Sequence, residues 1–162
     1  LRYPQKTRKL ILCDTFGSLK TLQEKLIGAA TVVGYKLFGF MPPEKVAETF
    51  ASAYDFPGGE KAKEYFRYVA ENLDIKQITV ARKAINRAAT EDRLHQVSTP
   101  VLLLVGNRPG DFFINMTRRL SNALHVEFIE IEGALDPSNL SAPAVFDKHV
   151  LKFLGKHVES EE

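Results

Sequence analysis

Three short apolar runs, separated by sequence that favours helices, constrain the fold of this chain more than any other feature. The runs are Leu10–Cys13, Val97–Gly106 and the alternating segment Val126–Ile131. Continuous apolar runs of this length are typical of parallel strands that are covered on both faces. The order along the chain is strand, helical block, strand, helix, strand and helix. This order predicts an α/β fold with a parallel sheet of three strands joined by right-handed crossovers.

The helical block between the first two runs shows local helix signals and no strand pattern. Pro43, followed by a glutamate, predicts a helix start, because the first turn tolerates proline and its dipole favours a carboxylate. Asp74 is placed to cap another helix, which we expect to run to about Ala89. Asp111 to Leu124 carries apolar residues at helical spacing and predicts the helix between the last two strands.

Composition excludes several classes of function. The 162 residues are 44% hydrophobic and 26% charged, which are values of a globular domain. The net charge is +2 and no run is rich in Lys and Arg, so we expect no nucleic-acid partner. No segment has about 20 uninterrupted apolar residues, so we expect no membrane span. The lone Cys13 excludes an internal disulfide framework and fits a cytoplasmic location. We expect residues 159–162 to form a solvated acidic tail.

The first apolar run raises the question of what covers it. A strand that is almost wholly apolar invites association when it lies at the bare edge of a sheet. We favour further strands upstream in a longer parent protein. The alternative is a partner chain on this edge, as in a dimer formed through the exposed strand.

Several motifs resemble the α/β-hydrolase fold superfamily. Residues Tyr3–Thr15 resemble the segment downstream of the nucleophile elbow, where a helix ends before the sixth strand. Thr99–Gly106 looks like the seventh strand, and Val126–Ala134 like the eighth strand with the loop that holds the catalytic histidine. The resemblance implies the C-terminal half of such a protein, with a partial parallel sheet. The implied division is a helical lid at 19–94 and a core part made of 1–18 and 95–162.

The resemblance also implies catalytic positions, and this chain departs from them. The family order is nucleophile, acid, histidine, and no Gly-x-Ser-x-Gly motif occurs in the chain. Pro109 stands at the position of the triad aspartate, so Asp111 becomes the candidate for a displaced acid; the alternative is that it caps the helix that starts there. Asp136 stands at the position of the histidine. A carboxyl with a pKa of about 4 is a poor base at neutral pH unless it is strongly perturbed, and a turn residue before Pro137 is the alternative.

Two further candidates follow the first strand. Asp14 and Phe16 lie at its carboxyl end, where sheets of this type bind ligands, so we expect them to contact substrate. The alternative for Asp14 is that its side chain caps the turn through Thr15 and Gly17. The four histidines show no metal-ligand spacing, so we predict neither a metal nor a cofactor.

The resemblance leaves two functions open. In the first, the parent protein hydrolyses a small, mostly apolar ester or related substrate, and this chain supplies lid and pocket wall. The chain would not be catalytic by itself, because the nucleophile is absent. In the second, the parent is a non-catalytic pseudo-hydrolase similar to maspardin-type proteins, which acts as a binding or adaptor module for a protein partner. The ordered match of the three strand motifs motivates the first, and the departures at Pro109 and Asp136 motivate the second.

Overall fold

The chain folds into two units, and each has hydrophobic clusters of its own. The sheet unit is made of Leu1–Phe16 and Glu91–Glu162, and the helical unit of Gly17–Thr90. The structure is a computed structural model that describes residues 3–155. The acidic residues 159–162 lie outside the described residues.

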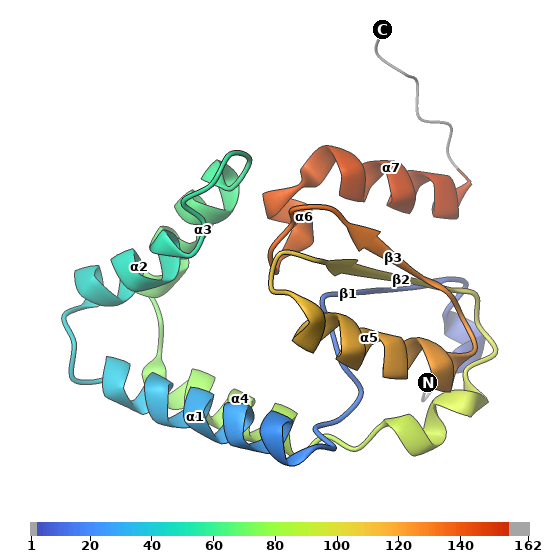
Figure 1. Ribbon diagram of the computed structural model, residues 1–162, viewed down its shortest axis with the longest axis horizontal. Helices are drawn as coiled ribbons and strands as arrows, with labels where there is room; N and C mark the ends of the chain where they lie inside the picture. Colours follow the sequence, from blue (N-terminus) through green and yellow to red (C-terminus); the bar gives the residue numbers. More distant parts are fainter. Residues whose placement is uncertain (1–2, 156–162) are drawn as a thin grey trace, which may run out of the picture. The chain divides into compact units, whose positions relative to one another are not determined.

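A parallel sheet in the order β1-β2-β3 forms the centre of the sheet unit, which confirms the predicted fold class (Figure 1). Its strands are β1 (Leu10–Cys13), β2 (Val101–Gly106) and β3 (Phe128–Ile131). Cys13 lies opposite Leu104, and Gly106 lies opposite Ile131. Within the described residues β1 pairs with β2 alone, so β1 is an edge strand of this sheet.

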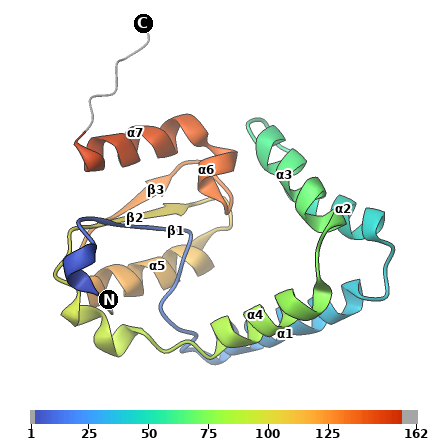
Figure 2. The same cartoon turned by 180° about the vertical axis from the view of Figure 1, so that it is seen from behind.

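Helices cover both faces of the sheet (Figures 1 and 2). The elements around the sheet are η1 (Pro4–Lys6), η2 (Glu91–Gln96), α5 (Asp111–Leu124), α6 (Ser138–Ser141) and α7 (Pro143–Leu154). On the α5 face, Leu103 clusters with Leu120. On the α7 face, Phe146 packs against the cluster that contains Leu104. Leu103 and Leu104 are both 0% exposed, and this burial on both faces explains the continuous apolar sequence of β2.

The helical unit consists of two packed helix pairs. Its helices are α1 (Leu22–Phe38), α2 (Pro43–Ser52), α3 (Glu60–Glu71) and α4 (Ile75–Asn86). In Figure 1, α1 packs along α4 and α2 packs along α3. Local signals start two of these helices. Thr21 and Glu24 form a capping box at the start of α1, and Asp74 caps α4 as predicted.

Small and aromatic side chains form the interior of the helical unit. Ala47 and Ala70 are buried between α2 and α3. The rings of Tyr54 and Phe66 stack with their centroids 4.9 Å apart.

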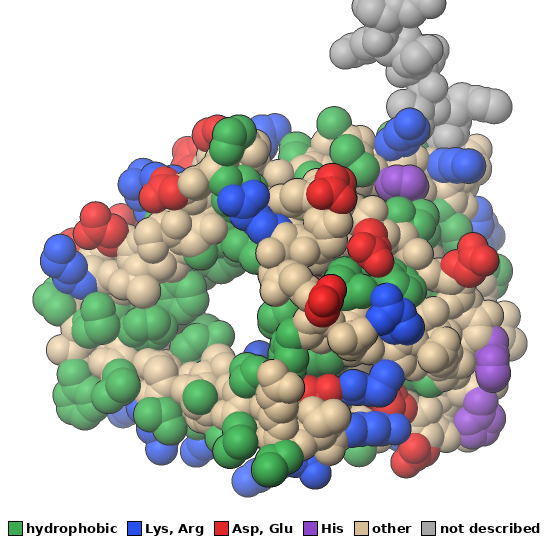
Figure 3. Space-filling view, in the orientation of Figure 1, with side chains coloured by type: hydrophobic (Ala, Val, Ile, Leu, Met, Phe, Trp, Pro, Cys, Tyr) green, Lys and Arg blue, Asp and Glu red, His purple; other side chains and the backbone are tan. Residues whose placement is uncertain are grey.

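Helix α1 leaves large aliphatic side chains exposed, and Figure 3 shows hydrophobic surface along this helix. We call them the α1 stripe: Leu22, Leu26, Val33 and Leu37. Within residues 3–155, no helix combines the length and apolar character that crossing a bilayer requires.

Candidate functional site

Asp14 follows β1 and joins three segments of the sheet unit. Its Oδ1 accepts hydrogen bonds from the backbone N–H of Gly106 at 2.9 Å and from the hydroxyl of Ser138 at 2.7 Å. Its Oδ2 accepts hydrogen bonds from the backbone N–H of Ser138 at 2.7 Å and from the thiol of Cys13 at 3.2 Å. The carboxylate therefore links the ends of β1 and β2 to the start of α6, instead of capping the turn that follows it.

The backbone around Asp14 is closely constrained. Asp14 has a φ of 48°, in the left-handed region that residues other than glycine seldom adopt. At Gly106, an added Cβ would lie 2.4 Å from the carbonyl oxygen of Ala134 and 2.9 Å from the hydroxyl of Ser138. The close approach of these segments therefore requires glycine at the end of β2. It also fixes the loop between β3 and α6, which carries Asp136.

Asp136 is a titratable group whose pKa this arrangement raises. Burial, followed by the nearby charge of Asp14, raises the pKa of the Asp136 carboxyl to about 6. The residue as a whole is exposed, so solvent screens part of the charge interaction with Asp14. The sequence-based objection to Asp136 as a base assumed an ordinary pKa. The structure places this carboxyl in the range where it changes protonation near neutral pH.

Cys13 belongs to the same group of side chains. Burial, and after it the charge of Asp14, raises the pKa of the Cys13 thiol. The thiol is therefore protonated at neutral pH, as its hydrogen bond to Asp14 requires. A protonated, partly buried thiol is a weak nucleophile, so Cys13 acts as a structural donor.

A small apolar pocket lies beside these carboxylates. It has a volume of 110 Å³, and Asp14, Phe16 and Asp136 are among the residues that line it. Met116 of α5 contributes to its apolar wall. Asp111 is exposed in the first turn of α5 and does not line this pocket. The structure thus brings three of the predicted site residues together and leaves Asp111 outside the group.

Two residues of this group did not emerge from the sequence as site residues. Gly106 ends a buried strand just before a loop, which is a typical place for a close backbone approach and could have indicated its role. Ser138 is fully buried and lies 124 residues away from Asp14 in the sequence. No local pattern connects positions that far apart.

The chemistry of the group is that of two neighbouring carboxylates, one of which has a raised pKa. A carboxyl whose pKa is raised by burial and by a neighbouring carboxylate is typical of sites that hold and release a proton. Among the described residues, no cluster of three or more His, Cys, Asp or Glu side chains is arranged to hold a metal ion. The pocket is smaller than common ligand sites, which enclose about 300 Å³ or more, so it fits one small apolar group of a ligand.

Comparisons with known proteins support the fold. No protein-family model matches the chain, and neither does any curated protein. An enol-lactonase from Burkholderia xenovorans is 19% identical with a TM-score of 0.71, over 96% of this chain and 59% of that protein. A thermophilic esterase from Thermogutta terrifontis is 18% identical with a TM-score of 0.71, over 95% of this chain and 58% of that protein. An α/β hydrolase enzyme from a Medee basin deep-sea metagenome library is 17% identical with a TM-score of 0.68, over 99% of this chain and 61% of that protein.

The chain therefore has the fold of the C-terminal part of α/β hydrolases, as the sequence motifs indicated. It spans from 58% to 61% of the length of these three structures. At this level of identity the likeness establishes the fold alone.

Proposed function

We propose that the chain is the lid-bearing C-terminal portion of an α/β-hydrolase-like protein that hydrolyses a small, mostly apolar ester or related substrate. In this proposal the helical unit is the lid, and the sheet unit supplies one wall of the substrate site. The supporting observation is the 110 Å³ apolar pocket that Asp14, Phe16 and Asp136 line. It lies at the carboxyl ends of the strands, where sheets of this kind bind ligands.

Asp136 is the group that we assign to proton transfer, because it stands where the family has its histidine. A base is most effective when its pKa lies near the working pH, and the pKa of Asp136 is about 6. Asp14 is a positioning residue that holds the Asp136 loop through Ser138. Phe16 supplies apolar wall for the substrate. Asp111 stays a prediction as a displaced triad acid.

We expect the chain by itself to be inactive toward esters. Its 162 residues contain no Gly-x-Ser-x-Gly motif. A triad that lacks its nucleophile retains only a small part of its catalysis. In this proposal the nucleophile comes from an upstream segment of a longer protein.

The test is an assay of p-nitrophenyl acetate and butyrate with this chain and with the longer protein that its reading frame encodes. We expect the longer protein alone to hydrolyse them, with activity that rises with pH through the pKa of Asp136. Asp136→Asn should lower kcat/KM by about 100-fold, the usual size of a lost general base. Asp111→Asn tests the separate prediction that Asp111 is a displaced triad acid: a comparable loss of kcat/KM would support that role, and an unchanged kcat/KM would contradict it. Unchanged activity in Asp136→Asn would contradict the proposal.

A non-catalytic pseudo-hydrolase is the second candidate. Pro109 and Asp136 replace two catalytic residue types of the family, which favours a binding or adaptor module similar to maspardin-type proteins. A fluorophosphonate probe, which reacts with activated serines, separates the two candidates. Labelling of the longer protein would exclude the second, whereas absence of both labelling and turnover would support it.

We also propose how the β1 edge is covered. In the longer protein, further strands pair with β1, and in the isolated chain a second copy does so. Light scattering after size-exclusion chromatography should then give the mass of a dimer for the isolated chain, and a monomer at every concentration would contradict this proposal. The free thiol of Cys13 supports a further proposal, that the protein works in the reducing cytoplasm.

A further inference from the structure

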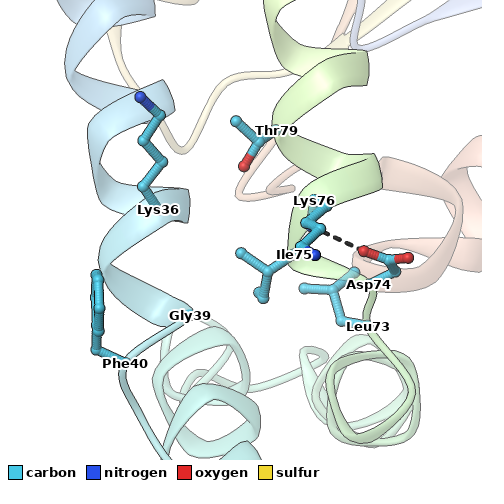
Figure 4. Close-up of a pocket in the computed structure, with 8 residues that line it drawn as sticks. All are labelled: Lys36, Gly39, Phe40, Leu73, Asp74, Ile75, Lys76 and Thr79. Carbon is cyan, nitrogen blue, oxygen red and sulfur yellow. Dashed lines mark hydrogen bonds between the residues drawn. The ribbon is translucent and has the colours of Figure 1, made fainter.

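A groove in the helical unit lies between the end of α1 and the start of α4 (Figure 4). Its volume of 850 Å³ falls within the range of small-molecule sites. Lys36, Gly39 and Phe40 line it from the α1 side. Ile75 and Thr79 line it from α4. All of these residues belong to the helical unit.

The hydroxyl of Thr79 is the polar group that marks this groove as a binding site. Thr79 is only 7% exposed, and its Oγ1 has no hydrogen-bond partner among the described residues. Figure 4 shows this hydroxyl on the side of α4 that faces the groove. Thr31 and Thr49 differ, because their hydroxyls donate to Ile27 and Lys45 carbonyl oxygens in their own helices. A buried hydroxyl without a partner is unfavourable, and a ligand that accepts its hydrogen bond removes the penalty.

The charges around the groove favour an anion. Figure 4 shows the ammonium group of Lys36 across the groove from Thr79, at the same end. Lys76 also lines the groove. The carboxylate of Asp74 accepts hydrogen bonds from the backbone N–H groups of Lys76 at 2.8 Å and Gln77 at 3.1 Å, and Figure 4 shows it turned away from α1. The whole of α4 carries basic residues and no acidic one.

The other end of the groove is apolar. Figure 4 shows Phe40 and Leu73 at this end and Ile75 directed toward α1. Phe40 is 88% exposed, an unusual degree for a phenylalanine unless something else covers it. The groove thus has a polar, basic end and an apolar end, which together match an amphipathic anion.

We propose that this groove binds a carboxylate with a medium-length alkyl chain, such as decanoate. Its carboxylate lies between the Lys36 ammonium and the Thr79 hydroxyl, which donates a hydrogen bond to it. Its alkyl chain runs past Ile75 toward Phe40 and Leu73. Binding of this ligand does not depend on the hydrolase function proposed above, because the groove is built from the helical unit alone.

Calorimetric titration of the whole chain with sodium decanoate tests the proposal. We expect saturable binding of one decanoate per chain and weaker binding of 1-decanol, which lacks the charge. Thr79→Val removes the hydroxyl at nearly constant shape and should weaken decanoate binding about tenfold. The same substitution should raise the thermal unfolding midpoint of the free chain, since it removes a buried hydroxyl that has no partner. A weaker affinity for decanoate together with a higher unfolding midpoint in Thr79→Val would show that the Thr79 hydroxyl serves binding, because a hydroxyl with a structural role would lower the midpoint when removed.

Three further variants complete the test. Thr79→Ser keeps the hydroxyl and should bind decanoate nearly as well as the unchanged chain. Lys36→Met should weaken binding about threefold, as expected for a partly exposed ion pair. Thr49→Val, whose hydroxyl bonds to Lys45 within α2, is the matched control and should not change affinity. Full affinity in Thr79→Val, equal affinity for 1-decanol or no saturable binding of decanoate would each overturn the proposal.

Discussion

Two parts of the molecule, the Asp14 group of the sheet unit and helix α4 of the helical unit, differ in how their buried polar groups are hydrogen-bonded. In the sheet unit, the Asp14 carboxylate accepts hydrogen bonds at both oxygens from Gly106, Ser138 and Cys13. In the helical unit, α4 carries buried polar atoms that have no partner among the described residues: Thr79 Oγ1, Arg82 Nε and Asn86 Oδ1. Satisfied networks hold a structure in one arrangement, whereas unsatisfied groups are sites where a ligand can gain binding energy.

The units also differ in how they bury aliphatic side chains. Leu103, Leu104 and Ile131 of the sheet unit are fully buried, whereas the α1 stripe of the helical unit is exposed. Exposed apolar groups of this size are typical of surfaces that meet a ligand or a partner. The comparison indicates a sheet unit whose contacts fix its geometry and a helical unit whose surface is available for binding.

The strongest test of this comparison is Asp14→Ala. It leaves the donors of Gly106 and Ser138 without their acceptor, so we expect a loss of about 4 kcal/mol in the free energy of unfolding. Urea unfolding followed by circular dichroism measures it. Asp111→Ala, at an exposed carboxylate outside the group, is the control. A loss below about 1 kcal/mol for Asp14→Ala would show that this network does not fix the sheet unit.

Gly106→Ala is expected to have the next largest effect. The new Cβ would lie 2.4 Å from the carbonyl oxygen of Ala134, and this contact is with backbone that cannot rotate away. We expect the free energy of unfolding to fall by about 3 kcal/mol, at the upper end for overpacking. Gly34→Ala, where an added Cβ meets nothing within 4 Å, is the matched control. An equal change in the free energy of unfolding of the two variants would mean that the backbone at the end of β2 shifts readily to make room for a Cβ.

Local sequence patterns predicted the elements well. Leu10–Cys13 forms β1, and Asp111–Leu124 forms α5 at the predicted bounds. Several boundaries were wrong. The second strand starts at Val101 instead of Val97, and the helix after Asp74 ends at Asn86 instead of about Ala89. The third strand starts at Phe128 instead of Val126, because the N–H of Val126 bonds to the carbonyl of Ser121 at the end of α5. Hydrophobic periodicity reports such elements because it depends on near neighbours in the chain.

The candidate site was predictable only in part. The carboxyl end of β1 pointed to Asp14 as a ligand-facing residue. Its partners Gly106 and Ser138 lie 92 and 124 residues away, and no spacing rule reaches that far. The raised pKa of Asp136 depends on burial and on the charge of Asp14, so it too follows from the folded arrangement.

Asp136→Asn tests whether burial, and after it the charge of Asp14, disfavours the ionised form of the Asp136 carboxyl in the folded sheet unit. The pKa of Asp136 in the folded chain, about 6, is above its value in the unfolded chain, so ionisation opposes folding. The loss of folding stability caused by ionised Asp136 is absent below about pH 4, grows up to about pH 6 and is constant above that. We expect Asp136→Asn to be more stable than the unchanged chain by about 1 kcal/mol at pH 8, after allowance for solvent screening. Urea unfolding at pH 3.5 and pH 8 measures this; a difference independent of pH would contradict the assigned cause.

Leu26→Gln tests the other side of the comparison and should have the smallest effect. Leu26 belongs to the α1 stripe and is 60% exposed, and leucine and glutamine have similar helix propensities. We therefore expect the free energy of unfolding to change by less than about 0.5 kcal/mol. A loss above about 1 kcal/mol, together with an unfolding midpoint that depends on protein concentration, would mean that a second copy covers the stripe. The helical unit would then bury its aliphatic side chains as the sheet unit does, and the remaining difference would be the one between the Asp14 group and α4.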